Sequence, residues 1–288
     1  MAKTLTRRGR DEWNRLIATE GKVLGLSECR PFLENKLVND IFYEGEFKGG
    51  ACVVKCSSHA PESIMNEYEM SRRLAAIAPV CAEALAKWRS SDGRRAFVVT
   101  RRLPGPSLTD LLVRGVDDME AVGILEDMVS IAEALLKGGI VWRDIIPENF
   151  LMDADGHLKL IDAQFAIDRG NFREDPFLNA HWRYRMLLFA HHPMMAGRGW
   201  NDVGMMLRYA RYLPLATATC ADPLLARLRE LERQSAFPMA YGAGDSVRMA
   251  LYLPILAGQW VFAVRSRRRR ALRERMGRAW RFLTGRRR

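Results

Sequence analysis

Residues 141–162, with the sequence VWRDIIPENFLMDADGHLKLID, carry the most informative pattern in this chain. Asp144 follows a short apolar run, and Asn149 comes five positions later. The apolar residues after Asn149 are expected to form a β-hairpin about the Asp-Ala-Asp-Gly turn at 153–156. Asp162 follows the second strand, eighteen residues after Asp144. Because the hairpin should return Asp162 to the level of Asn149, we expect these three side chains to lie together.

Two carboxylates and one amide in such an arrangement suit phosphoryl transfer. That reaction needs one carboxylate to orient the attacking hydroxyl group, and oxygen ligands that hold Mg²⁺ against the phosphates of a nucleotide. Mg²⁺ keeps several of its waters, so few protein ligands suffice. The pattern therefore predicts a site for ATP and Mg²⁺.

The same residues resemble elements of protein kinases. The WRD at 142–144 with Asn149 looks like the H-R-D-x-x-x-x-N catalytic loop, and Asp162 looks like the aspartate of D-F-G. Upstream, the Val-Val-Lys that ends at Lys55 looks like the V-A-I-K strand. The resemblance covers roughly residues 32–215 and implies an α+β, protein-kinase-like two-lobed fold. Its N-lobe would be small and β-rich and its C-lobe helical, with a basic helical tail beyond.

The resemblance implies a role for each matched residue. Asp144 would be the catalytic carboxylate, and Asn149 and Asp162 would hold Mg²⁺. Lys55 would hold the α- and β-phosphates of ATP and would itself be fixed by a glutamate. Asp202 resembles the aspartate that opens the main C-lobe helix and braces the catalytic loop, which is a structural role.

Helix geometry selects the glutamate that should pair with Lys55. The helix predicted to start at Pro61 and run to about residue 78 contains Glu67 and Glu69. One face of it holds Ile64, Glu67, Ser71 and Leu74. Glu69 is about 200° further round the helix than Glu67. Because the face with Leu74 should pack inward, we predict that Glu67 is the partner of Lys55.

The nucleotide contacts are less clearly marked in the sequence. The adenine is expected against residues 100–104, where the backbone of Arg101 and Leu103 can bond it. The glycine-rich phosphate loop of kinases is degraded, because only Gly45, Gly49 and Gly50 are available and they do not follow the order G-x-G-x-x-G. Of these, Gly45 is the predicted phosphate contact.

Three departures from the kinase motifs bear on the acceptor. Trp142 replaces the histidine of H-R-D, and Ala-Gln at 163–164 replaces the Phe-Gly of D-F-G. Ile146 stands where serine/threonine kinases usually carry a lysine. The sequence looks most like the bacterial lipopolysaccharide core kinases, which phosphorylate heptose or Kdo sugars. The resemblance implies a sugar kinase acting on a lipid-linked glycan; the alternatives are an atypical protein or small-molecule kinase and a membrane-bound pseudokinase adaptor.

The predicted organisation has four parts. Residues 1–31 form an N-terminal helical extension, 32–104 the ATP-binding N-lobe, 105–246 the C-lobe with the catalytic loop and acceptor site, and 247–288 an apolar segment with an Arg-rich tail. Strands are expected within 32–56 and at 97–100, and helices at 61–78, 117–137, 201–212 and 223–234.

Charge is concentrated at the C-terminal end. The net charge is +11, and residues 265–288 hold twelve arginines and one glutamate, so the rest of the chain is neutral. The apolar run 249–264 is shorter than the about 20 residues that a membrane span needs. A buried helix of the C-lobe, an interfacial segment and a membrane span are the alternatives for this run. Residues 271–283 form an amphipathic pattern that predicts an interfacial helix on anionic lipid. The alternative is a solvated or nucleic-acid-binding tail, although nucleic acid is not the expected partner.

Cysteine usage and the N-terminal sequence bear on location. The five cysteines are scattered and form no metal-binding pattern, which favours reduced thiols in a cytoplasmic protein. The N-terminus lacks the apolar region of a signal peptide. We expect a cytoplasmic monomer, peripheral at the inner membrane through residues 265–288.

Overall fold

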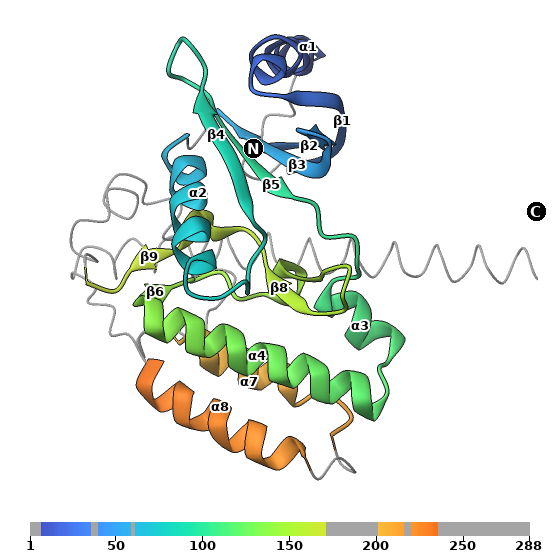
Figure 1. The fold of residues 1–288 in the computed structure, drawn as a ribbon, viewed down its shortest axis with the longest axis vertical. Coiled ribbons are helices and arrows are strands. Elements are labelled where there is room, and N and C mark those ends of the chain that lie inside the picture. Colours follow the sequence, from blue (N-terminus) through green and yellow to red (C-terminus); the bar gives the residue numbers. More distant parts are fainter. Residues whose placement is uncertain (1–6, 36–39, 59–60, 171–200, 216–219, 236–288) are drawn as a thin grey trace, which may run out of the picture. The chain divides into compact units, whose positions relative to one another are not determined.

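An antiparallel five-stranded sheet is formed by the N-terminal part of the chain (Figure 1). The computed structural model describes residues 7–35, 40–58, 61–170, 201–215 and 220–235, all within one compact unit. The strands are β1 (Leu26–Asn35), β2 (Asp40–Phe47), β3 (Gly50–Ser57), β4 (Ala84–Arg89) and β5 (Ala96–Arg101), in the order β1-β2-β3-β5-β4. Lys55 of β3 pairs with Phe42 of β2 and Val98 of β5.

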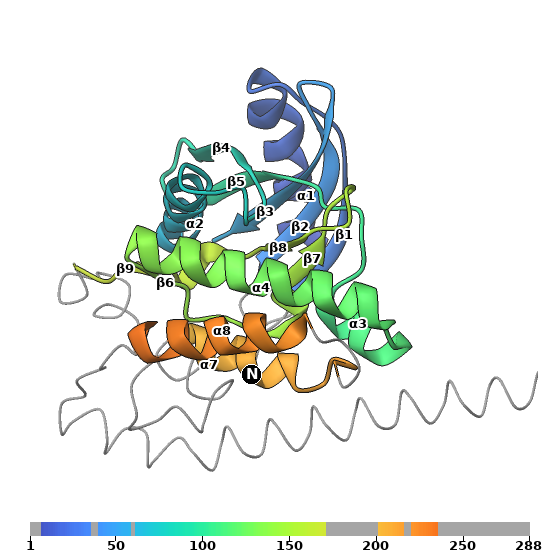
Figure 2. The ribbon, with the colours of Figure 1, turned by 60° about the horizontal axis from the view of Figure 1, so that its bottom comes forward.

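Helices precede, interrupt and follow this sheet in the chain. The α- and π-helices of the described residues are α1 (Arg7–Leu16), the π-helix η1 (Ile17–Gly21), α2 (Pro61–Ala75), α3 (Leu108–Arg114), α4 (Asp118–Gly138), α7 (Asp202–Ala210) and α8 (Ala221–Ser235). Asp117 caps the start of α4 by accepting a hydrogen bond from the Glu120 amide at 2.8 Å, and Gly139, with a φ of 59°, ends that helix. Helices α4, α7 and α8 contact one another and lie side by side in Figure 2.

The two faces of the sheet are covered by different helices. Successive side chains of a strand point to opposite faces. Phe97 of β5 packs in the cluster that contains Trp13 of α1, whereas its neighbour Val98 packs with Ile64 of α2. Trp13 meets Phe97 edge-on with ring centroids 5.2 Å apart. Helices α1 and α2 therefore cover opposite faces, and α2 is held against the strand that pairs with Lys55.

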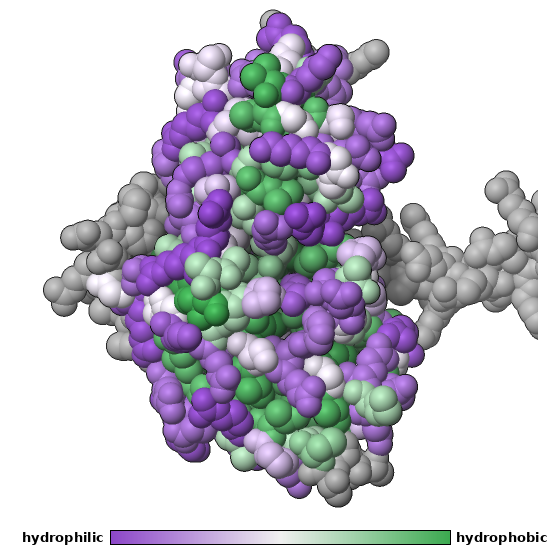
Figure 3. All heavy atoms as spheres, in the orientation of Figure 1, coloured by the Kyte–Doolittle hydropathy of each residue, from purple (hydrophilic) through white to green (hydrophobic). Residues whose placement is uncertain are grey.

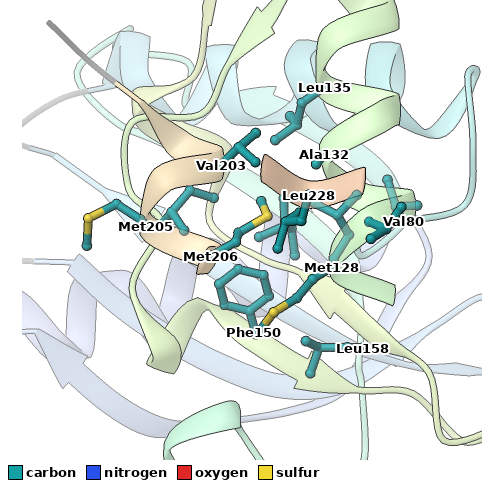
Figure 4. Close-up of a cluster of buried hydrophobic side chains, with 14 of the residues drawn as sticks. Val80, Met128, Ala132, Leu135, Phe150, Leu158, Val203, Met205, Met206 and Leu228 are labelled. Carbon is teal, nitrogen blue, oxygen red and sulfur yellow. The ribbon is translucent and has the colours of Figure 1, made fainter. Parts of the chain in front are cut away.

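The apolar core of the helical part anchors a β-hairpin. Strands β7 (Phe150–Met152) and β8 (Leu158–Leu160) pair antiparallel, as the sequence predicted. Figure 4 shows Phe150 and Leu158 beside Met128 of α4, in a cluster that includes residues of α7 and α8. Asp127 of α4 adds a polar link, because its Oδ2 accepts a hydrogen bond from the Leu158 amide at 2.6 Å. The hairpin is thereby fixed to α4.

The sheet followed by helices agrees with the α+β prediction, with differences at several boundaries. Strand β1 begins at Leu26, so the end of the predicted 1–31 helical extension is extended instead of helical. Helix α2 ends at Ala75, before the predicted residue 78. Strand β4 and helix α3 were not predicted. The signal for α3 was present as a capping box, in which Ser107 and Asp110 bond each other's backbone amides.

The surface of the described residues is mixed in polarity. Exposed side chains form ion pairs such as Arg89–Glu62 and Arg101–Glu83, and hydrophilic and hydrophobic side chains are intermixed on the face shown in Figure 3. No helix in the described ranges is both long and apolar enough to cross a membrane. The predicted apolar segment and tail, 247–288, lie outside the described residues.

Candidate active site

The loop that carries Asp144 is held by a buried carboxylate on α7. Strand β6 (Ile140–Val141) pairs with β9 (Ile167–Asp168) and leads into this loop. Asp202, at the first position of α7, accepts hydrogen bonds from the amides of Trp142 at 2.5 Å and Arg143 at 3.0 Å. Arg143 has a φ of 69°, a left-handed conformation that costs free energy in a residue with a side chain. The two charge-assisted bonds to Asp202 stabilise this backbone turn.

A tyrosine on the same helix also supports the loop. The hydroxyl of Tyr209 donates a hydrogen bond to the carbonyl of Ile145 at 2.8 Å. Burial raises the pKa of this hydroxyl, so it stays protonated as a donor. The role of Tyr209 is not predictable from the sequence, because a tyrosine within an amphipathic helix carries no local signal for such a contact.

The structure brings Asp144, Asn149 and Asp162 together. Asn149, at the end of the 3-10 helix η2 (Pro147–Asn149), donates from Nδ2 to the Asp144 carbonyl at 3.0 Å and to Asp144 Oδ2 at 2.9 Å. The Ile161 amide donates to the Asn149 carbonyl at 2.9 Å, so the chain reaches Asp162 directly beside Asn149. The hairpin thus returns Asp162 to the level of Asn149, as the sequence pattern predicted.

Lys55 joins the sheet, helix α2 and Asp162. Its Nζ lies 2.7 Å from Asp162 Oδ1 and 3.0 Å from Glu67 Oε2. Lys55 and Glu67 are each 4% exposed, and Glu69 pairs instead with Lys87 at the surface. Glu67, the glutamate predicted from the face of the helix, is therefore the one that lies beside Lys55. A buried lysine between two carboxylates forms a network in which each charge has a partner.

The environment of Asp144 changes its acidity. Burial, together with the negative charge of Asp162, raises the pKa of the Asp144 carboxyl to about 7, against the lowering effects of the hydrogen bond from Asn149 and the charge of Lys55. A carboxyl whose pKa lies near neutrality can accept a proton from a hydroxyl group more readily than an ordinary aspartate. Strongly shifted carboxyls of this kind are typical of functional sites.

The donor atoms of the site fit Mg²⁺. Both hydrogen bonds of the Asn149 amide use its nitrogen, so its oxygen would be available as a metal ligand together with the carboxylate of Asp162. Mg²⁺ is commonly bound by one or two such oxygens and by substrate phosphates. The described part of the chain contains no group of three or more His, Cys, Asp or Glu residues that could hold a metal.

The segment between β5 and α3 presents backbone groups where the adenine was predicted. The amide of Arg101, at the end of β5, donates to the carbonyl of Glu83 at 2.8 Å, so it is not available for the predicted contact with the adenine. The amide of Arg102 donates to the carbonyl of Ala51 at 3.1 Å. The Leu103 amide has no backbone partner within the residues that the structure describes. Gly105 lies so close to β7 that an added Cβ would be 2.6 Å from Met152 Cβ, so this segment is fixed against the hairpin.

Gly45 is not brought to this site. It lies within β2 and pairs with Cys52, three residues before Lys55 on β3, which is about 10 Å along the strand. A Cβ at Gly45 would lie 2.7 Å from Cys29 Sγ and 2.8 Å from the Ser27 carbonyl. The close approach of β1 therefore explains this glycine, and the predicted phosphate contact at Gly45 is corrected on that ground.

The comparisons with known proteins point to kinases. No protein family model matches the chain. The chain is 37% identical over 81 residues to the cAMP-dependent protein kinase catalytic subunit PRKX of Mus musculus, covering 27% of this chain and 23% of that protein. It is 37% identical over 76 residues to the serine/threonine-protein kinase PknL of Mycobacterium tuberculosis, covering 26% and 19%. It is 36% identical over 74 residues to the serine/threonine-protein kinase CBK1 of Candida albicans, covering 25% and 10%.

These similarities are partial, and the chain spans less than a quarter of the length of each of these relatives. They support a protein-kinase-like superfamily. The sheet, the helices and the grouping of Lys55, Glu67, Asp144, Asn149 and Asp162 are compatible with that superfamily.

Proposed function

We propose that this protein is an ATP- and Mg²⁺-dependent phosphotransferase that transfers the γ-phosphoryl group of ATP to a hydroxyl group. The observation that carries the proposal is the joining of Lys55 to Glu67 and Asp162, next to an Asn149 that is bonded to Asp144. Phosphoryl transfer depends mainly on positioning and on electrostatic stabilisation, and this network supplies both.

Each residue has a part in this proposal. Asp144 orients the acceptor hydroxyl and takes its proton. Lys55, held by Glu67, contacts the α- and β-phosphates. When bound, Mg²⁺ would neutralise charge on the phosphates, and Asn149 and Asp162 would be the residues that hold it. The adenine lies against residues 100–104, where the Leu103 amide offers a hydrogen-bond donor.

The proposed acceptor is a sugar hydroxyl of a lipid-linked glycan such as the lipopolysaccharide core. The support is Ile146, which stands two residues after Asp144 where serine/threonine kinases usually carry lysine. A second candidate is a protein hydroxyl, because the relatives quoted above are named serine/threonine-protein kinases or a cAMP-dependent protein kinase subunit. A membrane-bound pseudokinase adaptor would use the same fold without turnover.

The proposed location is the cytoplasmic face of the inner membrane, with residues 265–288 on anionic lipid. The support is the segregation of twelve arginines into this stretch. Fractionation of cells that express the full chain or a chain ending at Val247 tests the location. Loss of membrane recovery in the shorter chain is expected, and unchanged recovery would refute it.

An acceptor panel tests the proposed reaction. The purified full chain is incubated with γ-labelled ATP and Mg²⁺, and with lipopolysaccharide core, a generic protein or neither. Transfer to the core, lost in Asp144→Asn and kept in Glu69→Gln, supports the sugar acceptor; transfer only to protein supports the second candidate. If Mg²⁺ and ATP bind but no acceptor is labelled under any condition, the adaptor remains.

A further inference from the structure

The backbone just after Asp162 is held by side chains from two other parts of the fold. Asn66 of α2 donates from Nδ2 to the carbonyl of Gln164 at 3.3 Å and to the carbonyl of Ala166 at 2.8 Å. The carbonyl between them, that of Phe165, accepts a hydrogen bond from Nε of Arg143. Three consecutive carbonyls, which lie in and directly after the 3-10 helix η3 (Ala163–Phe165), are therefore bound by side chains.

Helix α2 is connected to Asp162 in two ways: through Glu67 and Lys55 to its side chain, and through Asn66 to the main chain that follows it. Glu67 contacts Lys55 at 3.0 Å, and Lys55 contacts the Asp162 carboxylate at 2.7 Å. The adjacent residue, Asn66, binds the main chain two and four residues after Asp162. These contacts close a ring from the Asp162 side chain through Lys55 and α2 back to the Asp162 main chain. A movement of α2 would disturb both connections at once.

The local conformation explains why such an anchor is needed. Asp162 has a φ of 65°, in the left-handed region that residues with a side chain adopt at a cost in free energy. The next residue, Ala163, is fully buried but carries only a methyl group, so it offers little bulk directly after Asp162; the first large apolar side chain, that of Phe165, comes three residues after Asp162 and is 6% exposed. Directional hydrogen bonds from an amide can fix the backbone where a large apolar side chain is missing.

We propose that Asn66 is a positioning residue for Asp162, which it holds at the geometry needed to bind Mg²⁺. The role rests on the function proposed above, since it concerns the same metal ligand. The anchoring concerns the backbone of residues 162–168, and its effect on hydrogen–deuterium exchange there can be measured without turnover.

The test compares Asn66→Asp, Asn66→Leu and Glu69→Gln in the full chain. Asn66→Asp keeps the side-chain shape but turns an oxygen toward two carbonyls, and Asn66→Leu removes the donor. Glu69 lies on the same helix and pairs with Lys87 outside the ring, so Glu69→Gln is the matched control. The measurements are ATP turnover as a function of Mg²⁺ concentration, thermal unfolding, and hydrogen–deuterium exchange of the peptide that covers residues 162–168.

Both Asn66 variants should lower kcat about tenfold or more, which corresponds to about 1.4 kcal/mol or more of transition-state stabilisation. They should also raise the Mg²⁺ concentration for half-maximal rate several-fold and speed exchange of residues 162–168. Glu69→Gln should leave all three unchanged. If the variants unfold at a lower temperature but keep the wild-type Mg²⁺ dependence and exchange of 162–168, Asn66 is only structural and the proposal is overturned.

The two proposals fail in different ways. If the wild-type chain neither binds nor turns over ATP with Mg²⁺, the proposed function fails, and the exchange experiment alone decides on Asn66. Faster exchange of 162–168 in Asn66→Asp than in Glu69→Gln then supports the anchoring, and equal exchange overturns it.

Discussion

Lys55 Nζ lies 2.7 Å from Asp162 Oδ1, although 107 residues separate them along the chain. The contact joins the sheet to the segment that follows the β7–β8 hairpin. Because Glu67 of α2 contacts the same ammonium group at 3.0 Å, one lysine connects three parts of the fold. Its removal should therefore affect stability and activity together.

Replacement of Lys55 by methionine tests this connection. The change keeps the length of the side chain but leaves Glu67 buried without its cation, so we expect a loss of about 3 kcal/mol in the free energy of unfolding. Activity should fall at least about 100-fold, because the proposed phosphate contact is lost. Urea unfolding and ATP turnover measure the two effects. The control is Lys87→Met, which removes a surface lysine and should change neither; equal effects at both positions would contradict the account.

The charge balance of the network predicts how two substitutions combine. Glu67→Gln on the Lys55→Met background removes the buried negative charge from which the first change took the Lys55 cation. The double variant should therefore be more stable than the sum of the single losses predicts, by about 1–3 kcal/mol. Additive losses would show that Lys55 and Glu67 do not interact in solution.

Asp202 should be essential for the loop that carries Asp144. In the wild type the amides of Trp142 and Arg143 each donate to a different carboxylate oxygen of Asp202. In Asp202→Asn only one side-chain oxygen remains to accept these two hydrogen bonds. Leaving one buried amide unpaired should cost about 1–3 kcal/mol of the free energy of unfolding. Chemical denaturation measures the loss, and Asp222→Asn at the exposed start of α8 is the control. A stability loss no larger than that of the control would show that these two bonds do not support the loop.

The buried carboxyl of Asp144 predicts a pH dependence of stability. Its pKa is raised to about 7, mainly by burial, so the folded protein holds this proton to a higher pH than the unfolded chain, where aspartate titrates near 3.9. The free energy of unfolding should therefore fall as pH rises from about 4 to about 7. Asp144→Asn removes the titrating group and should raise Tm by roughly 3–6 °C at pH 8. The gain should vanish near pH 4.

Thermal unfolding across this pH range, in EDTA and without nucleotide, checks the prediction. The variant should be inactive while it is more stable, which is a common trade between stability and function. A pH-independent difference in Tm, or a variant less stable than wild type at pH 8, would show that burial of Asp144 is not costly.

The N-terminal helix should stabilise the sheet although it lies outside the candidate site. Trp13 is 2% exposed and packs edge-on against Phe97, which stacks on Trp88 at 4.3 Å. Trp13→Ala should cost about 3–5 kcal/mol of the free energy of unfolding. Val23→Ala, at a side chain that is 88% exposed, should cost almost nothing. Similar unfolding curves for both variants would show that α1 does not cover the sheet in solution.

The sequence predicted the structure best where a local pattern allows only one arrangement of the chain in space. A short hairpin between Asn149 and Asp162 returns the chain to its starting level, and the helical repeat puts Glu67 and Leu74 on one face. Contacts made by tertiary packing gave no such signal. Tyr209 and Asn66 meet backbone carbonyls 64 and 98 or more residues away. Gly45 was misread because a glycine required by a neighbouring strand looks, in sequence, like one required by a ligand.

The role of Asp162 in binding Mg²⁺ for phosphoryl transfer is tested most directly by ATP turnover. Purified full-length wild type and Asp162→Ala are compared at equal concentration, each with Mg²⁺ and with EDTA. If Asp162 binds Mg²⁺, wild-type turnover depends on Mg²⁺ and falls about 100-fold or more in Asp162→Ala. Turnover that is equal in the two proteins, or wild-type turnover that does not respond to EDTA, would contradict the proposed role of this site.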